Sequence, residues 1–147
     1  MLCLNETKTD EDKLDLKRFD KQIPGDYAQY WNCCTEKKGY SGTAIFTKIA
    51  PLKVEYNFGK HLTQGRSITM EFPTFTLVCT YVPNASEGLK RLNYRIEEWD
   101  KDFHAYLKHL EEERGKPVVL TGDLNVAHHD IDIYDPKNKE KTPGFTP

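Results

Sequence analysis

The chain has 147 residues, which is enough for one domain with a buried core and too few for two of ordinary size. Its 21 Lys and Arg residues against 23 Asp and Glu residues give a formal net charge of -2 at pH 7. This balance excludes a basic field over the whole surface, so any binding of nucleic acid must rest on a local patch or on a metal ion.

The cysteines and the two ends of the chain indicate its cellular setting. Cys3, Cys33, Cys34 and Cys79 have neither the spacing of a zinc site nor the density of a disulfide scaffold, which favours a reducing compartment. No window approaches the roughly 18 apolar residues of a transmembrane helix, and the start lacks a signal-peptide pattern, so we expect a soluble intracellular protein.

Residues 1–4 already have the pattern of a buried strand, and the chain ends abruptly in KTPGFTP. We therefore expect a piece of a longer protein.

Short runs of β-branched and aromatic residues predict the strands of one sheet. In chain order they are QYWNCC, GTAIFTK, LKVEYNF, SITMEF and FTLVCTYV, separated by Gly, Pro and polar residues. Ile68, Met70 and Phe72 alternate with polar residues, which is typical of a strand with one buried face. Residues 75–82 are more continuously apolar, as expected for a central strand covered on both faces.

Residues 86–115 predict a long helix, because apolar residues recur there at intervals of three and four. Ser86 is a suitable N-cap, and Gly115 followed by Pro117 would end the helix. The single apolar stripe predicts that this helix packs on the sheet. KPVVLTGDLN follows as another buried strand, and strands on both sides of a long helix predict an α/β layered domain.

Two acidic residues follow predicted strands: Glu6 comes after MLCLN and Asp123 after VVLTG. In layered α/β proteins ligands bind at the carboxyl ends of strands. Alternation in an extended segment would point Asp123 and Asn125 to one face and Leu124 back toward the core. A sparse set of oxygen ligands suits Mg²⁺, which keeps several waters and binds phosphate. The pattern therefore indicates metal-assisted hydrolysis of a phosphoester.

The same residues also have ordinary structural interpretations. Glu6 could form a salt bridge with Lys8 or Arg66, and Asp123 could cap a turn. Spacing alone slightly favours these interpretations over a metal site.

Two further segments carry polar and aromatic residues suited to such a site. TYVPNA ends the predicted central strand, and the stiff Pro83 could fix the Tyr81 hydroxyl and the Asn84 amide at the same edge. A buried tyrosine with a satisfied hydroxyl is the alternative. In KKGYSG, Gly39 precedes Tyr40, which gives a loop whose backbone can approach a phosphate and whose ring can pack on a sugar.

Basic side chains near these segments are candidates for contact with phosphate groups. They are Lys90, Arg91, Arg95, Lys137, Lys139 and Lys141. His128 and His129 are adjacent, so in a regular strand they would point to opposite faces and could not share a metal. We expect both histidines to be structural or solvent-facing.

Six blocks, in this order and at these spacings, are LCLNETK, GYSG, TYVPNA, RLNYR, GDLNVAHHDID and GFTP. Together they resemble the exonuclease III class of apurinic/apyrimidinic endonucleases, particularly the animal-type enzymes, within the endonuclease/exonuclease/phosphatase superfamily. The resemblance runs over practically the whole chain. It implies one partial α/β domain over residues 1–147: a four-layered sandwich of two packed mixed sheets flanked by helices, with the second half mostly missing here.

The resemblance also implies a DNA repair endonuclease. Such an enzyme hydrolyses the phosphodiester 5′ to abasic sites in double-stranded DNA, with 3′ exonuclease and phosphodiesterase side activity, in base excision repair. It implies Mg²⁺ as cofactor, with Mn²⁺ as an alternative ion. It further implies a monomer that does not associate with membranes and works in the nucleus, or else in the mitochondrion.

Site residues follow from the resemblance by position. Glu6, Asp123 and Asn125 are implied as metal ligands. Tyr81 is implied near the scissile phosphate, Asp123 as the group that handles the nucleophilic water, and Asn125 as the group that orients it. The positions implied to contact DNA are Lys8, Gly39, Tyr40, Asn84 and Arg91.

The chain also departs from the family pattern. Glu87 stands where the animal-type pattern has a basic residue, and Lys139 and Thr142 replace asparagines. An upstream strand with an Asn and an acidic residue, a later Asp-His pair and a Ser-Asp-His motif have no counterpart in these 147 residues. We therefore expect this chain alone to be inactive or nearly so. Two alternatives stay open: a metal-dependent phosphatase of a phosphorylated lipid or small molecule, and a non-catalytic fragment that binds DNA or a protein.

Overall fold

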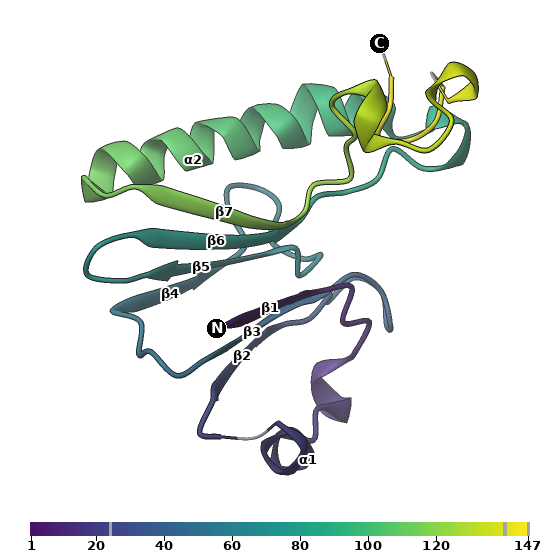
Figure 1. Cartoon of the computed structure of the whole chain (residues 1–147). Coiled ribbons are helices and arrows are strands. Elements are labelled where there is room, and N and C mark those ends of the chain that lie inside the picture. Colours follow the sequence, from purple (N-terminus) through teal and green to yellow (C-terminus); the bar gives the residue numbers. More distant parts are fainter. Residues whose placement is uncertain (24, 140, 147) are drawn as a thin grey trace.

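Two sheets make up the frame of the molecule in the computed structural model, which describes residues 1–23, 25–139 and 141–146 (Figure 1). The first sheet has the strand order β1-β3-β2, formed by β1 (Leu2–Asn5), β2 (Ala28–Asn32) and β3 (Thr43–Thr47). The second has the order β4-β5-β6-β7, formed by β4 (Lys53–Tyr56), β5 (Ser67–Glu71), β6 (Thr76–Tyr81) and β7 (Val118–Asp123). The prediction of a single sheet is therefore wrong, because alternation along a strand does not reveal which sheet the strand joins. The two-sheet arrangement implied by the resemblance is confirmed.

The helices lie outside these sheets. The α-helices are α1 (Leu16–Gln22) and α2 (Asp100–Arg114), a π-helical segment spans Tyr94–Trp99, and 3-10 turns cover Glu11–Lys13, Glu87–Leu89, Asp130–Asp132 and Pro136–Asn138. Figure 1 shows α2 lying along the second sheet and α1 beside the first. None of the described helices is long and apolar enough to span a membrane.

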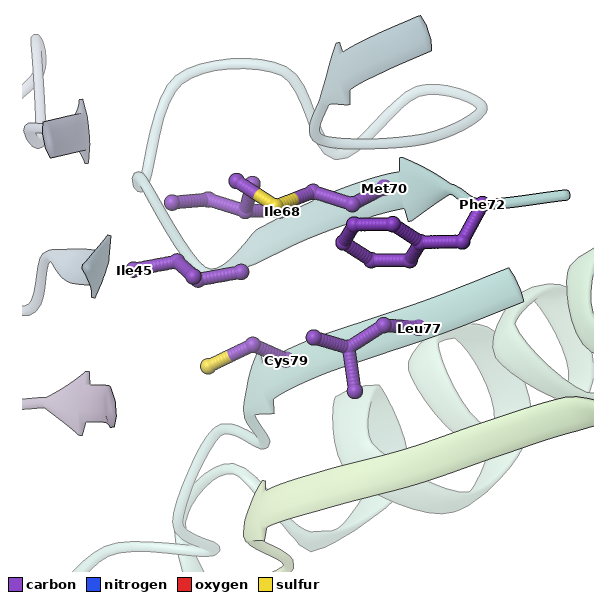
Figure 2. Packing of buried hydrophobic residues seen from close by; sticks show 6 residues of the cluster. All are labelled: Ile45, Ile68, Met70, Phe72, Leu77 and Cys79. Carbon is purple, nitrogen blue, oxygen red and sulfur yellow. The ribbon is translucent and has the colours of Figure 1, made fainter. Parts of the chain in front are cut away.

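Strand β6 is central, as its sequence predicts. It pairs antiparallel with β5 and parallel with β7. Leu77 and Cys79 face the first sheet, while Val78 between them faces the helical side. The buried cluster between the sheets contains Ile45, Ile68, Met70, Phe72, Leu77 and Cys79 (Figure 2). The cluster toward α2 contains Phe58, Val78, Val82, Trp99, Phe103 and Leu110.

The long helix begins later than residues 86–115 predict. Ser86 has φ +66° and its side chain makes no cap hydrogen bond, and Gly88, at φ +67°, interrupts the first turn. Regular α-helix spans Asp100–Arg114, and the C-cap Gly115, with a φ of +56°, confirms the predicted stop. The periodicity predicted a longer α-helix because 3-10 and π turns also place apolar residues about three to four positions apart.

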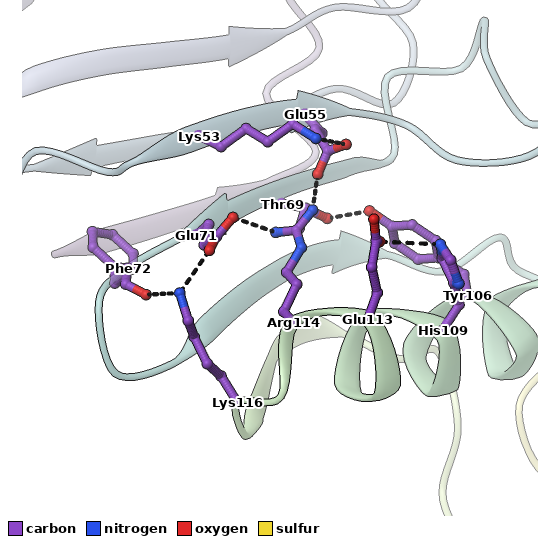
Figure 3. A network of polar contacts seen from close by, with 10 residues as sticks. All are labelled: Lys53, Glu55, Thr69, Glu71, Phe72, Tyr106, His109, Glu113, Arg114 and Lys116. Atoms are coloured by element: carbon purple, nitrogen blue, oxygen red, sulfur yellow. Dashed lines mark hydrogen bonds and ion pairs between the residues drawn. The ribbon is translucent and has the colours of Figure 1, made fainter.

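Ion pairs fasten the carboxyl end of α2 to the second sheet (Figure 3). Arg114 pairs with Glu55 on β4 and lies near Glu71 on β5. Just past the helix, the Lys116 ammonium lies 2.6 Å from a Glu71 carboxylate oxygen, and this contact lowers the pKa of Glu71. About two turns earlier, the Tyr106 hydroxyl lies 2.8 Å from the Thr69 hydroxyl. The position of α2, and so of the segment that follows it, is thereby fixed relative to β5.

Strand β7 is less buried than its sequence predicts. Within the described residues it forms the edge of its sheet, and Val119 and Leu120 remain 46% and 37% exposed. The expectation of a buried strand is therefore wrong for this chain. A continuous apolar run indicates a strand that other elements pack against on both faces, and β7 lacks part of that packing here.

Gly122 is required where β6 and β7 meet. Its φ is +129°, and a Cβ atom there would lie 1.9 Å from the carbonyl oxygen of Thr80, its partner in the parallel register. We predict that Gly122→Ala lowers the free energy of unfolding by about 3 kcal/mol, because the strands must separate to admit the methyl group. Urea denaturation monitored by circular dichroism measures the change.

Gly59→Ala is the matched control. Gly59 also has positive φ, at +51°, but no atom lies within 4 Å of its added Cβ, so only the left-handed backbone cost of about 1 kcal/mol is expected. Equal losses in the two variants would contradict a specific clash at Gly122.

Candidate active site

The carboxyl ends of β1, β6 and β7 meet at one rim, although β1 belongs to the other sheet. The Asn5 side-chain amide donates to the carbonyl of Thr80 at 2.9 Å, which joins the end of β1 to the end of β6. Tyr81 and Asp123 are partners in the parallel register of β6 and β7. Glu6, which follows β1, therefore reaches Tyr81 across the gap between the sheets rather than within one sheet.

Glu6, Lys8 and Tyr81 form the first group at this rim. The Tyr81 hydroxyl donates to one Glu6 carboxylate oxygen at 2.7 Å, and the Lys8 ammonium lies 2.5 Å from the other. Lys8 and then Tyr81 lower the pKa of Glu6, because both stabilise its ionised form. The salt bridge between Glu6 and Lys8 is thus confirmed. It does not exclude a functional role, since Glu6 and Lys8 are both exposed at the rim.

Tyr81 is held in its neutral form. Burial, and after it the Glu6 carboxylate, raises its pKa from 10 to about 12, and the guanidinium of Arg66 opposes part of this rise. At neutral pH the hydroxyl is therefore a hydrogen-bond donor directed at the rim.

Asp123, Asn125 and Asn84 form the second group. Asp123 accepts a hydrogen bond from the backbone N–H of Asn125 at 2.8 Å, so it caps a turn as the structural interpretation predicts. The Asn125 side-chain amide donates to the carbonyl of Val82 at 2.9 Å, and its oxygen accepts from Asn84 at 3.2 Å. Asn125 has φ +48°, so the turn, and not strand alternation, brings it to Asp123. The expected inward direction of Leu124 is wrong, because that side chain is 39% exposed.

Tyr40, Arg66 and Arg91 form the third group. Arg66 is only 2% exposed, and its guanidinium lies 4.7 Å from the Tyr81 ring centroid and 5.5 Å from that of Tyr40. The Tyr40 hydroxyl accepts from Arg66 at 2.9 Å and from Arg91 at 3.3 Å. The sequence suggested Arg66 only as a salt-bridge partner of Glu6. An isolated arginine before a strand does not indicate which side chains will surround it.

The loop of Gly39 and Tyr40 is held by a residue that the sequence did not single out. Asp10 is buried and accepts a hydrogen bond from the backbone N–H of Gly39 at 2.7 Å. Because this N–H is already bonded to Asp10, it is not free to donate a hydrogen bond to a phosphate. Lys8 ties the same loop to the end of β1, because its N–H donates to the carbonyl of Ser41 at 2.9 Å.

Arg95 is largely buried, unlike a side chain free to bind phosphate. Its side chain is 13% exposed, and its guanidinium points to Asp100 and to backbone carbonyls of the rim loops. The structure thus gives Arg95 partners within the protein in place of the predicted phosphate contact. His128 and His129 are both exposed, with their ring centroids 4.1 Å apart, which confirms that they face solvent. Lys90, Lys137 and Lys141 are exposed.

The rim offers oxygen donors of the kind that a hard cation accepts. The carboxylates of Glu6 and Asp123 are exposed, and the Asn125 amide lies beside Asp123. A cation at Glu6 would compete with Lys8 for the same carboxylate. In the part of the chain that the structure describes, no group of three or more His, Cys, Asp or Glu residues could hold a metal. Such a sparse set of oxygen donors would suit only an ion that keeps several waters in its shell.

The hydrogen bond between Tyr81 and Glu6 has a consequence for pH. We predict that the Tyr81 hydroxyl contributes stability below pH 10 and that this contribution is lost as the pH rises from 10 to about 12, because the folded-state pKa is the higher one. Titration of ¹³C-labelled tyrosine by NMR measures this pKa. Glu6→Gln should lower it toward 10, whereas an unchanged value would show that the carboxylate is not its partner.

Comparison with known proteins places the whole chain in one family. A model of the Endonuclease/Exonuclease/phosphatase family matches residues 1–146. The chain is 49% identical over 156 residues to the DNA repair nuclease APEX1 of Danio rerio, covering 100% of this chain and 46% of that protein. It is 43% identical over 148 residues to an exodeoxyribonuclease of Bacillus subtilis, covering 99% of this chain and 55% of that protein.

A solved structure of an AP endonuclease from Leishmania major has the same fold. It superposes with a TM-score of 0.76 at 29% identity, covering 98% of this chain and 52% of that one. The chain thus spans about half the length of the relatives it matches. The match to the family model over nearly every residue shows that the chain belongs to the Endonuclease/Exonuclease/phosphatase family.

Proposed function

We propose that this chain carries part of the active site of a DNA repair endonuclease that hydrolyses the phosphodiester 5′ to abasic sites. The observation that carries the proposal is the meeting of Glu6, Tyr81, Asp123 and Asn125 at one rim, from strands of two sheets. The names of its relatives, a DNA repair nuclease and AP endonucleases, support DNA as the substrate. A 3′ exonuclease and phosphodiesterase side activity belongs to the same proposal and is supported by the exodeoxyribonuclease relatives.

The side chains at the rim suit hydrolysis of a phosphoester. The exposed Asp123 carboxylate can hold or deprotonate an attacking water, and Asn125, fixed by its bonds to Val82 and Asn84, can orient that water. The neutral Tyr81 hydroxyl can donate to a phosphate oxygen in place of Glu6.

Glu6 and Asp123, with the Asn125 amide, would hold a divalent cation at this rim. We propose Mg²⁺, with Mn²⁺ as an alternative, because all three supply oxygen donors. The bound ion supplies neutralisation of charge on the phosphate and on the leaving oxygen.

Contacts with double-stranded DNA are proposed at Lys8, Tyr40, Asn84 and Arg91. Lys8 and Arg91 are cationic, and Tyr40 presents a ring beside them that can pack on a sugar. The Gly39 N–H is bound to Asp10, so we propose that Gly39 contributes by letting the backbone come close to the DNA and not by donating this hydrogen bond. Because the net charge is -2, this local patch must provide the attraction for phosphate. Such an enzyme would act as a monomer in base excision repair, in the nucleus or the mitochondrion.

We predict that the 147-residue chain alone does not nick an abasic duplex in Mg²⁺. It spans about half the length of its relatives, and no described histidine forms a hydrogen bond with Glu6 or Asp123. Gel electrophoresis of a duplex with a single abasic site measures nicking. Activity of the chain alone that Asp123→Ala abolishes would contradict the prediction.

A chimera tests the proposed function directly. This chain replaces the matching region of the Danio rerio nuclease, to which it is 49% identical. We expect Mg²⁺-dependent incision 5′ to the abasic site, and a loss of about 100-fold or more in kcat for Asp123→Asn or Asn125→Ala, because each removes a group acting on the water.

Asp130→Asn is the matched control, since Asp130 is exposed, belongs to the same carboxyl-terminal segment and loses the same charge. Two outcomes would overturn the proposal. One is salt-dependent binding of the abasic duplex with no cleavage, which favours a non-catalytic protein. The other is hydrolysis of a phosphorylated lipid or small molecule with no action on DNA.

A further inference from the structure

The Arg95 guanidinium lies between the two loops that carry the rim amides. One terminal nitrogen donates to the carbonyl of Pro83 at 3.0 Å, in the loop after β6, and to that of Asn125 at 3.3 Å, in the loop after β7. The other donates to the carbonyl of Leu124 at 3.0 Å. Nε donates to Asp100 at 2.8 Å, at the first residue of α2. A single side chain thus joins both loops to the helix.

We propose that Arg95 is a positioning residue that sets the distance and orientation between Asn84 and Asn125. The proposal rests on the proposed function, in which these two amides face the water and the DNA. It replaces the expectation that Arg95 contacts phosphate, because its side chain is 13% exposed and its donors are engaged inside the protein.

The bonds of Asn125 explain why its backbone must be held. The residue has φ +48°, a left-handed conformation that asparagine adopts more readily than other residues with a Cβ atom but that still needs a defined turn. Its side-chain amide donates to Val82, and its side-chain oxygen accepts from Asn84, so the orientation of its amide depends on both loops. Val82 and Asn84 both follow β6, so a shift of one loop relative to the other would break these bonds. Arg95 binds the backbone on both sides of this pair.

The chemistry of the guanidinium suits this task. It has five N–H donors in a planar fork, and four hydrogen bonds from three different nitrogens are present here. An ammonium has three donors around one nitrogen and cannot reach Asp100 and the two loops with the same geometry. Arg95→Lys therefore keeps the charge while losing the simultaneous contact.

A cavity of about 190 Å³ borders the same place, lined in part by Arg95, Asp100, Asn125 and Gly144. If the guanidinium is removed, water can enter from this cavity and bind the freed carbonyls. The two loops can then move independently, while the strands that precede them keep their ladders.

Hydrogen exchange of the full 147-residue chain, followed by NMR without metal or DNA, tests the proposal. The informative amides are those of Ser86, which donates to the Asn84 side chain, and Asn125, which donates to the Asp123 side chain. We expect exchange at both to be about tenfold faster in Arg95→Met, and intermediate in Arg95→Lys. The signals of the Asn125 side-chain amide should shift as well, because its bond to Val82 depends on the loop geometry.

Lys101→Met is the matched control. Lys101 lies in the adjoining first turn of α2 and its substitution loses the same charge, but its partner is the exposed Glu97, so no change at the rim is expected. If Arg95→Met does not fold, Arg95→Lys carries the test alone.

Three results would overturn the proposal: unchanged exchange at Ser86 and Asn125, faster exchange in only one of the two loops, or an equal increase at Ile68 in β5. The last would show that Arg95 only stabilises the fold. Since neither metal nor DNA is present, failure here is distinguishable from failure of the proposed nuclease activity.

Discussion

The parallel pairing of β6 and β7 is the constraint on which the rim depends. Parallel strands end at the same edge of a sheet, so Tyr81 and Asp123 become neighbours although 42 positions separate their numbers. The connection between them must cross the sheet, and α2 does this while covering Val78 on the helical face. The pairing is also close: Gly122 lies against Thr80 with no room for a Cβ atom. Any change that separates these strands therefore separates the tyrosine from the carboxylate.

The first sheet contributes Glu6 because the two sheets pack face to face. Apolar side chains from both fill the space between them, and at the rim the apolar contact gives way to polar bonds such as the one from Asn5 to Thr80. That bond places the end of β1 beside the end of β6, so Glu6 can accept from Tyr81. The rim thus depends on two different forces, with hydrophobic packing setting the separation of the sheets and the hydrogen bonds fixing their relative position along the strands.

Much of this arrangement could be predicted from local pattern. Continuous apolarity identified β6 as central, and the residues directly after strands identified Glu6 and Asp123. What the pattern could not supply was the placement of long polar side chains. Arg66 precedes a predicted strand and Arg95 lies within the predicted helix, and neither pattern shows that one lies between two tyrosines and the other between two loops. Tertiary packing determines where these side chains lie, and this packing cannot be predicted from a short stretch of neighbouring residues.

These two arginines also explain how a rim suited to phosphate can exist in a chain with net charge -2. Within the described residues, the hydrogen bonds of Arg66 go to neutral groups, namely Gln64, the Tyr81 carbonyl and Tyr40, so its charge is not cancelled by a bound carboxylate. It acts on the rim instead, where it lowers the pKa of Glu6 and opposes the rise at Tyr81. Arg95 has Asp100 as a direct partner, which balances its charge locally. Arg66 therefore supplies positive potential to the rim, whereas Arg95 holds the two rim loops in position.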